Sequence, residues 1–159
     1  MLYEYILGAI DINTLLRENA YNNYSSKEAQ VRAPKYGGAL YPTKDNKYEG
    51  CWVSLKPGEA MNVHGFLPKK TLYASYVFYD RWYNTPNYRK INSFRTMDEI
   101  VLNSDGSFDL YISPEKINHP NWIDTGGLFG GSYSSRYMLS EETVFPDIKV
   151  IKISDVKKQ

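Results

Sequence analysis

Cysteine is almost absent from this chain, since Cys51 is the only one among 159 residues. A single thiol cannot form an internal disulfide, so we expect a fold that does not depend on oxidising conditions. The two histidines, His64 and His119, have no second ligand near them at a metal-binding spacing. This pattern argues against a structural zinc site. We therefore expect neither a bound metal nor any other cofactor.

An excess of one charge and long hydrophobic runs are also lacking. Nineteen Lys and Arg residues face eighteen Asp and Glu residues, so there is no electrostatic reason to expect a nucleic-acid partner. No stretch approaches the roughly 18 apolar residues of a membrane span, and the N-terminus lacks the basic start of a signal peptide. The sequence predicts a protein without a membrane span that is cytoplasmic or virion-associated.

The common catalytic motifs are missing too. There is no Gly-X-Ser-X-Gly elbow, and Cys51 lies in an alternating run beside Trp52, which favours a buried structural thiol. Asp105 and Asp109 are the nearest approach to a carboxylate pair. A turn explains the first, however, and the solvent face of a strand explains the second. We expect a protein that is not an enzyme.

Four glycines lie close together between residues 126 and 131. A phosphate-binding loop would need a helix after these glycines, with a Lys beside a Ser or Thr. The residues that follow are strand-like instead. We therefore expect these glycines to supply backbone positions with positive φ.

Tyrosine and short apolar runs are plentiful. Aromatic residues make up 15% of the chain and fifteen of them are tyrosines, an excess typical of β-rich proteins and of contact surfaces. Alternating runs bounded by turn residues succeed one another, which is the pattern of an all-β fold. They cover residues 51–55, 61–64, 71–79, 108–112, 133–139 and 147–153. Because both faces of the 71–79 run are apolar, with Leu72, Ala74, Tyr76 and Phe78 on one of them, we expect a central strand covered on both sides.

Helical spacing occurs only near the N-terminus, where Ile12, Leu15 and Leu16 recur at three-to-four-residue intervals. We therefore predict one all-β sandwich domain over residues 32–159. A short helical arm over residues 1–31 precedes it and either packs on the sheet or reaches onto a partner.

The stretch from His119 to Tyr137 is a proline- and glycine-punctuated loop that runs into a strand. In the interpretation that we favour, it is architectural: Trp122 plugs one end of the sandwich, and a polar lock holds the loop. Asp124 accepts hydrogen bonds from the N–H groups of the glycines that follow and pairs with a strand arginine. The predicted lock consists of Asp124, Gly126, Gly127 and Arg136.

The same loop also supports a ligand-binding interpretation. In this alternative, Trp82 and Trp122 form an aromatic platform, and polar side chains contact a sugar or a small acid. The predicted polar contacts are His119, Asn121, Asp124 and Arg136.

Four motifs together resemble the family known as domain of unknown function 1214. In chain order they are Leu55-Lys56-Pro57-Gly58-Glu59-Ala60, Tyr79-Asp80-Arg81-Trp82-Tyr83-Asn84 with Asn87-Tyr88, Asp105-Gly106-Ser107-Phe108, and Pro120-Asn121-Trp122-Ile123-Asp124-Thr125-Gly126-Gly127 followed by Arg136-Tyr137. The resemblance covers about residues 37–153. The chain departs from the family pattern at Leu128-Phe129, where many relatives have a histidine just after the glycines.

This resemblance implies a β-sandwich of jelly-roll type, which in longer relatives follows a second β domain. It implies no established reaction, cofactor or catalytic residue. Relatives occur in bacteria and in some large DNA viruses of algae. We therefore expect a non-catalytic structural or protein-interaction module, a virion or assembly component of a large DNA virus, that contacts a protein partner or a second copy of itself. The alternative is a carbohydrate- or small-ligand-binding protein, with or without hydrolysis, that uses residues 119–136.

Overall fold

The computed structural model describes residues 45–141, 144 and 146–156. Within these ranges the ordered elements are eight strands and one short 3-10 turn, and no α-helix occurs. The elements are β1 (Asn46–Ser54), β2 (Glu59–Phe66), β3 (Tyr73–Tyr79), β4 (Phe94–Thr96), β5 (Ser107–Ser113), β6 (Trp122–Asp124), β7 (Gly130–Met138), β8 (Asp147–Lys152) and η1 (Ile153–Asp155). The helical arm predicted over residues 1–31 lies outside the described residues.

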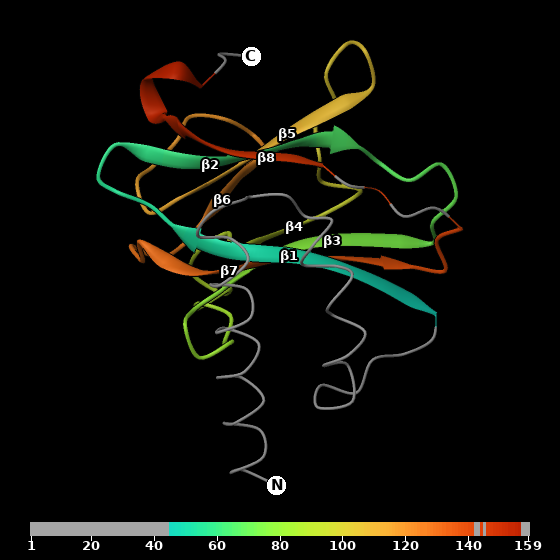
Figure 1. Cartoon of the computed structure of the whole chain (residues 1–159), viewed down its shortest axis with the longest axis horizontal. Coiled ribbons are helices and arrows are strands. Elements are labelled where there is room, and N and C mark those ends of the chain that lie inside the picture. Colours follow the sequence, from blue (N-terminus) through green and yellow to red (C-terminus); the bar gives the residue numbers. More distant parts are fainter. Residues whose placement is uncertain (1–44, 142–143, 145, 157–159) are drawn as a thin grey trace, which may run out of the picture.

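The strands form two four-stranded sheets that lie as two layers (Figure 1). The first sheet has the order β1-β7-β3-β4, and the second has the order β6-β5-β2-β8. Every neighbouring pair is antiparallel except β5 and β6, which run parallel. The structure confirms the predicted all-β sandwich.

Alternation along the strands builds the core between the two sheets. In β5, Phe108, Leu110 and Ile112 are buried on the face that was predicted to point inward. The residues between them point to the outer face of the second sheet. The remaining fully buried apolar side chains of this core include Val53, Met61, Val63, Ala74, Phe78 and Ile123. Removing this apolar area from water is the main favourable term in the stability of the domain.

Strand β3 lies inside its sheet, between β7 and β4, as the apolar run predicted. Ala74, Tyr76 and Phe78 are fully buried on its inner face. Leu72 does not share that face, because the strand starts one residue later; its side chain is 68% exposed. The prediction that Leu72 is a core residue is therefore wrong.

The inner face of the first sheet also carries polar groups. Glu49 on β1 lies opposite Ser135 on β7 and is only 2% exposed. The hydroxyl of Tyr137 donates to its Oε1 at 3.1 Å, whereas its Oε2 has no hydrogen-bond partner in the described part of the chain. Burial raises the pKa of Glu49 to about 8, and the hydroxyls of Ser135 and Tyr137 offset only part of that rise. The core therefore holds a neutral carboxyl group at pH 7.

Candidate functional site

Asn121 is the centre of the predicted loop site, and its side chain is completely buried. Its Oδ1 accepts from the backbone N–H of Val101 at 2.8 Å, and its Nδ2 donates to the carbonyl oxygens of Val101 at 2.7 Å and Asp109 at 3.0 Å. These bonds satisfy three backbone groups of two other segments. Asn121 is therefore bound to the protein itself and not directed at a ligand.

His119 has a similar internal role. Its ring is buried and lies edge-on against Tyr111, with ring centroids 4.7 Å apart. Its Nδ1 accepts from the backbone N–H of Asn121 at 3.1 Å, so the proton of the neutral ring is on Nε2. Burial lowers the pKa of His119, and the nearby Asp109 offsets only part of this. The imidazole is therefore kept neutral.

Trp122 packs on the outer side of the second sheet rather than plugging the end of the sandwich. It is half-buried against a small apolar cluster formed by Ala60, Tyr111 and Ile117. Its Nε1 lies 3.4 Å from the carbonyl oxygen of Ser113. The predicted end plug is wrong because β6 joins the sheet as a parallel edge strand, a pairing that places Trp122 on the same outer face as Tyr111.

One part of the predicted lock, the bond between Asp124 and the first glycine after it, is present in the turn that follows β6. Oδ1 of Asp124 accepts from the backbone N–H of Gly126 at 2.8 Å, and Gly126 and Gly127 have φ values of 68° and 83°. The expectation of positive φ at all four glycines is nevertheless wrong, because Gly130 and Gly131 are ordinary positions of β7. A Cβ on Gly131 would collide with the carbonyl oxygen of Tyr79, so close strand packing explains that glycine.

Arg136 has a different partner from the one predicted. It is the seventh residue of β7, and its Nε donates to Oδ1 of Asn46 on β1 at 2.9 Å. The guanidinium also lies over the ring of Tyr48, 5.7 Å from its centroid. Asp124 is held by its own turn instead. The lock between Asp124 and Arg136 is therefore wrong, because the two residues belong to opposite sheets and strand register could not be read from the sequence.

Trp82, the last predicted contact, is 57% exposed on the loop that joins β3 to β4. That loop has a fixed shape. Oδ1 of Asp80 accepts from the backbone N–H groups of Trp82 at 2.8 Å and Asn84 at 2.9 Å, and Tyr83 stacks on Tyr79 with ring centroids 4.4 Å apart. The loop therefore presents the Trp82 side chain outward from an ordered backbone.

Two contacting loops at this end of the sandwich carry large exposed apolar side chains. The backbone N–H of Asp124 donates to the carbonyl of Asn92 at 2.8 Å, and Gly126 packs against the side chains of Pro86 and Ile91. We call the exposed side chains of these two loops the loop-end surface. It comprises Trp82, Tyr88, Leu128 and Phe129, which are 40–57% exposed. Figure 1 shows the β3–β4 loop, in light green, projecting away from the strands.

Basic residues flank the aromatic residues of the β3–β4 loop in the sequence. Arg81, Arg89 and Lys90 are all exposed, and Asp80 is the only acidic residue between positions 80 and 92. A surface of this composition can bind through aromatic contacts at its centre and charge at its edge. Arg and Trp are also the side chains that most often dominate binding energy at protein interfaces.

A second polar arrangement, on the outer face of the second sheet, was not predicted. Oδ1 of Asp109 accepts from Nδ2 of Asn62 at 3.0 Å and lies 3.1 Å from Nδ1 of His64, and its Oδ2 accepts from Nδ2 of Asn103 at 3.0 Å. Asp109 was expected on a solvent face but is only 5% exposed. The alternation along β2 and β5 predicts which side chains share a face of each strand. Only the pairing of the two strands, which places His64 opposite Asp109, brings these two side chains together.

This cluster keeps its carboxylate charged. Burial alone would raise the pKa of Asp109, but hydrogen bonds from Asn62 and Asn103 and the neighbouring His64 hold it below its ordinary value. The imidazole of His64 remains 37% exposed. Within the described residues, no three His, Cys, Asp or Glu side chains gather as a metal site.

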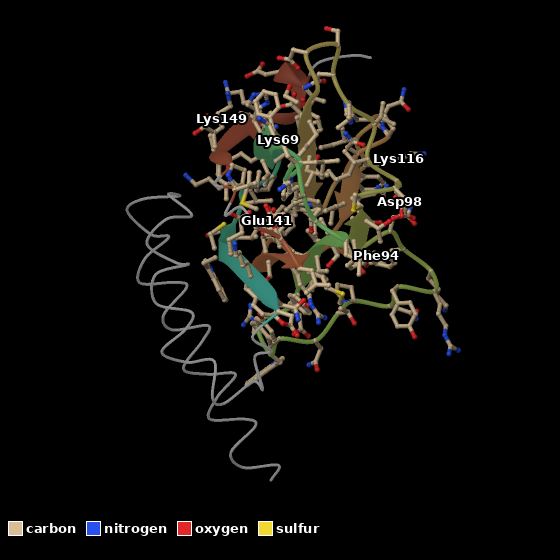
Figure 2. The ribbon with its side chains drawn as sticks, turned by 90° about the vertical axis from the view of Figure 1, so that its right-hand side faces the viewer. Lys69, Phe94, Asp98, Lys116, Glu141 and Lys149 are labelled. Carbon is tan, nitrogen blue, oxygen red and sulfur yellow. The ribbon has the colours of Figure 1, made fainter. Side chains whose placement is uncertain are left out.

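The D109N variant is expected to lose about 1–3 kcal/mol of unfolding free energy, because an amide nitrogen would face donors that now share a carboxylate. Urea unfolding followed by circular dichroism measures this. D98N is the matched control, since Asp98 is exposed at the surface of the domain (Figure 2). Equal stability of D109N and the wild type would show that the cluster does not hold the second sheet together.

The comparisons with known proteins support the fold. No family model and no curated protein matches the chain. An uncharacterised protein of known structure from Burkholderia cenocepacia is similar over 77% of this chain, with a TM-score of 0.72 and 18% identity. A protein from Vibrio parahaemolyticus is similar over 76% of it, with a TM-score of 0.53 and 16% identity.

These likenesses are of fold alone. The aligned part covers 34% and 35% of the two solved chains, so this chain spans about a third of the length of the proteins it matches. In the part of the chain that the structure describes, no helix has the length and apolarity needed to cross a membrane. The fold is therefore shown to be an all-β sandwich that also occurs within longer bacterial proteins.

Proposed function

We propose that this domain is a non-catalytic protein-interaction module that binds its partner through the loop-end surface. The observation that carries the proposal is the exposure of Trp82 and Tyr88, each 57%, on an ordered loop. Neighbouring exposed apolar side chains mark interaction sites more often than isolated ones do, and aromatic residues are enriched at protein interfaces.

The ordered backbone makes such a surface effective for binding. Side chains that are already held in place lose less conformational freedom on association. The carboxylate of Asp80 and the stack of Tyr83 on Tyr79 hold the first loop, while the Gly126 turn packs against it. The exposed basic residues Arg89 and Lys90, next to Tyr88 in the sequence, favour a partner with an acidic rim.

The ligand-binding alternative has less support. Trp122 packs on the second sheet, and among the described residues no ring contact joins it to Trp82. The polar groups of His119 and Asn121 bind the protein's own backbone. Membership of the domain of unknown function 1214 family and a role in a virion stay predictions from the sequence motifs.

A photo-activatable amino acid placed at position 82 is expected to crosslink a protein partner in the cells that produce the chain. The same group at position 72 is the control, because Leu72 is at least as exposed as Trp82 but lies at the opposite end of β3. The crosslinked partner is then purified and titrated calorimetrically against the purified domain. A loss of at least about tenfold in affinity is expected for W82A.

Equal crosslinking from both positions would contradict the proposal, as would unchanged affinity of W82A for the purified partner. Binding of a sugar on a glycan array that is abolished in W82A would favour the ligand-binding alternative instead.

A further inference from the structure

One row of inward-facing residues crosses three neighbouring strands of the first sheet, β1, β7 and β3. Ser135, at the centre of the row, lies opposite Glu49 on one side and opposite Tyr76 on the other. All three residues are buried. Each has a side-chain oxygen without a hydrogen-bond partner in the described part of the chain, namely Oε2 of Glu49, Oγ of Ser135 and the hydroxyl of Tyr76. Three unpaired polar groups therefore belong to neighbouring residues of the core.

A fourth unpaired group lies on the same face. Tyr133 precedes Ser135 by two residues on β7, so both side chains point into the core, and its buried hydroxyl has no partner among the described residues either. Burial raises the pKa of Tyr76 and Tyr133, and Glu49 is close enough to both hydroxyls to raise it further. Glu49, Tyr76, Tyr133 and Ser135 therefore form one group, which we call the core polar cluster.

Hydrogen-bond donors are in excess in the core polar cluster. Oε1 of Glu49 accepts from the hydroxyl of Tyr137, so the hydrogen of this neutral carboxyl group is left on Oε2. Each of the four residues of the cluster then has an O–H group without an acceptor among the described residues. Buried polar groups in proteins are rarely left unpaired, because such a group has lost its hydrogen bonds to solvent without replacement. The cluster therefore needs a small acceptor.

We propose that the core polar cluster binds an internal water molecule, held by Oε2 of Glu49, Oγ of Ser135 and the hydroxyl of Tyr76. A buried water typically makes about three hydrogen bonds to groups that the protein itself leaves unpaired. Water also fits the spacing of the row. Directly opposed residues on neighbouring antiparallel strands have Cβ atoms about 4.5–5.5 Å apart, and water bridges polar groups that do not bond to each other directly.

The ligand of this site must be uncharged. No Lys or Arg is among the buried residues that the structure describes, so an anion would have no counter-charge. The carboxyl group of Glu49 is itself neutral at pH 7, so a cation would have none either. The site lies between the sheets and shares no residue with the loop-end surface, so this proposal and the proposed function can fail independently.

A crystal structure of the full chain tests the proposal directly. We expect one water molecule within about 3 Å of three oxygens, which are Oε2 of Glu49, Oγ of Ser135 and the hydroxyl oxygen of Tyr76. Direct hydrogen bonds among these three oxygens, with no water between them, would overturn the proposal.

Oxygen-17 magnetic relaxation dispersion of the full chain in solution counts the water molecules that stay inside the protein. The Y76F/S135A variant removes two of the three partners and no carbon atom, so we expect it to hold one long-lived water fewer than the wild type. Y73F/S54A makes the same two changes on the outward faces of β3 and β1 and should keep the wild-type number. Equal numbers in the wild type and Y76F/S135A would contradict the proposed site. If that variant does not fold, the crystal structure of the wild type still decides.

Discussion

The E49Q variant is expected to be more stable than the wild type by several kcal/mol at pH 9 and nearly equal to it at pH 4. Glu49 is 2% exposed between the sheets, and burial raises its pKa to about 8 from an ordinary value of 4.5. Each unit of separation between the folded and unfolded pKa corresponds to about 1.4 kcal/mol. A glutamine keeps the acceptor that Tyr137 uses and removes the ionisable group.

The sign follows from which state releases its proton first. As the pH rises, the unfolded chain ionises Glu49 near pH 4.5, while the folded protein holds the proton until about pH 8. The contribution of this group to stability is therefore fully present below about pH 4.5. It declines as the pH rises and is lost once the pH passes about 8.

Urea unfolding of both proteins between pH 4 and pH 9 measures this effect, and the difference between them is the informative quantity. His119 acts in the opposite direction, because burial lowers its pKa and so favours folding as the pH rises through the ordinary histidine range. Subtracting the unfolding free energies of the two proteins at each pH removes the contribution of His119, which both share. Burial raises the pKa of Cys51 and Tyr137, so both stay neutral in the folded protein, and the ionisation of the unfolded Cys51 near pH 9 is common to both proteins and cancels in the difference. A difference that does not change with pH would contradict the assignment.

The N121A variant is expected to lose about 3–5 kcal/mol of unfolding free energy. Its side chain is fully buried and serves the N–H and C=O of Val101 and the C=O of Asp109. Truncation leaves these three backbone groups without partners in the interior, and each orphaned group costs roughly 1–3 kcal/mol. N121D should be at least as damaging, because its second oxygen would face two carbonyl oxygens.

Urea unfolding at pH 7 measures these losses, with N84A as the control. Asn84 is exposed in the β3–β4 loop, where its backbone N–H makes the bond to Asp80 and is unchanged by the substitution. A surface change of this kind costs at most about 0.5 kcal/mol. If N121A were as stable as N84A, the buried amide would not be holding its three backbone partners.

Features encoded within one strand could be predicted from the sequence. The alternation of Phe108, Leu110 and Ile112 gave a correct inward face, and the turn at Asp105 was also correct, since its Oδ1 accepts from the N–H of Ser107 at 2.9 Å. Such features depend on neighbours two residues apart. The buried thiol of Cys51 was likewise predicted from its place in an alternating run.

Features that depend on strand pairing could not be predicted. Arg136 was paired with Asp124 because the two are close in sequence, but β7 and β6 belong to different sheets. Asp109 was predicted to face solvent because the sequence alone does not show that His64 lies opposite it on the neighbouring strand. The three-residue strands β4 and β6 are too short for alternation to reveal them. Register and sheet membership, both set by long-range contacts, account for these errors.

The central claim is that the polar side chains of the segment from His119 to Thr125 stabilise the fold, whereas the exposed aromatic side chains of the β3–β4 loop serve binding. The most direct test compares the unfolding free energies of W82A and N121A in urea at pH 7. We expect W82A to stay within about 0.5 kcal/mol of the wild type and N121A to fall by about 3–5 kcal/mol. A strongly destabilised W82A beside an unaffected N121A would contradict the claim.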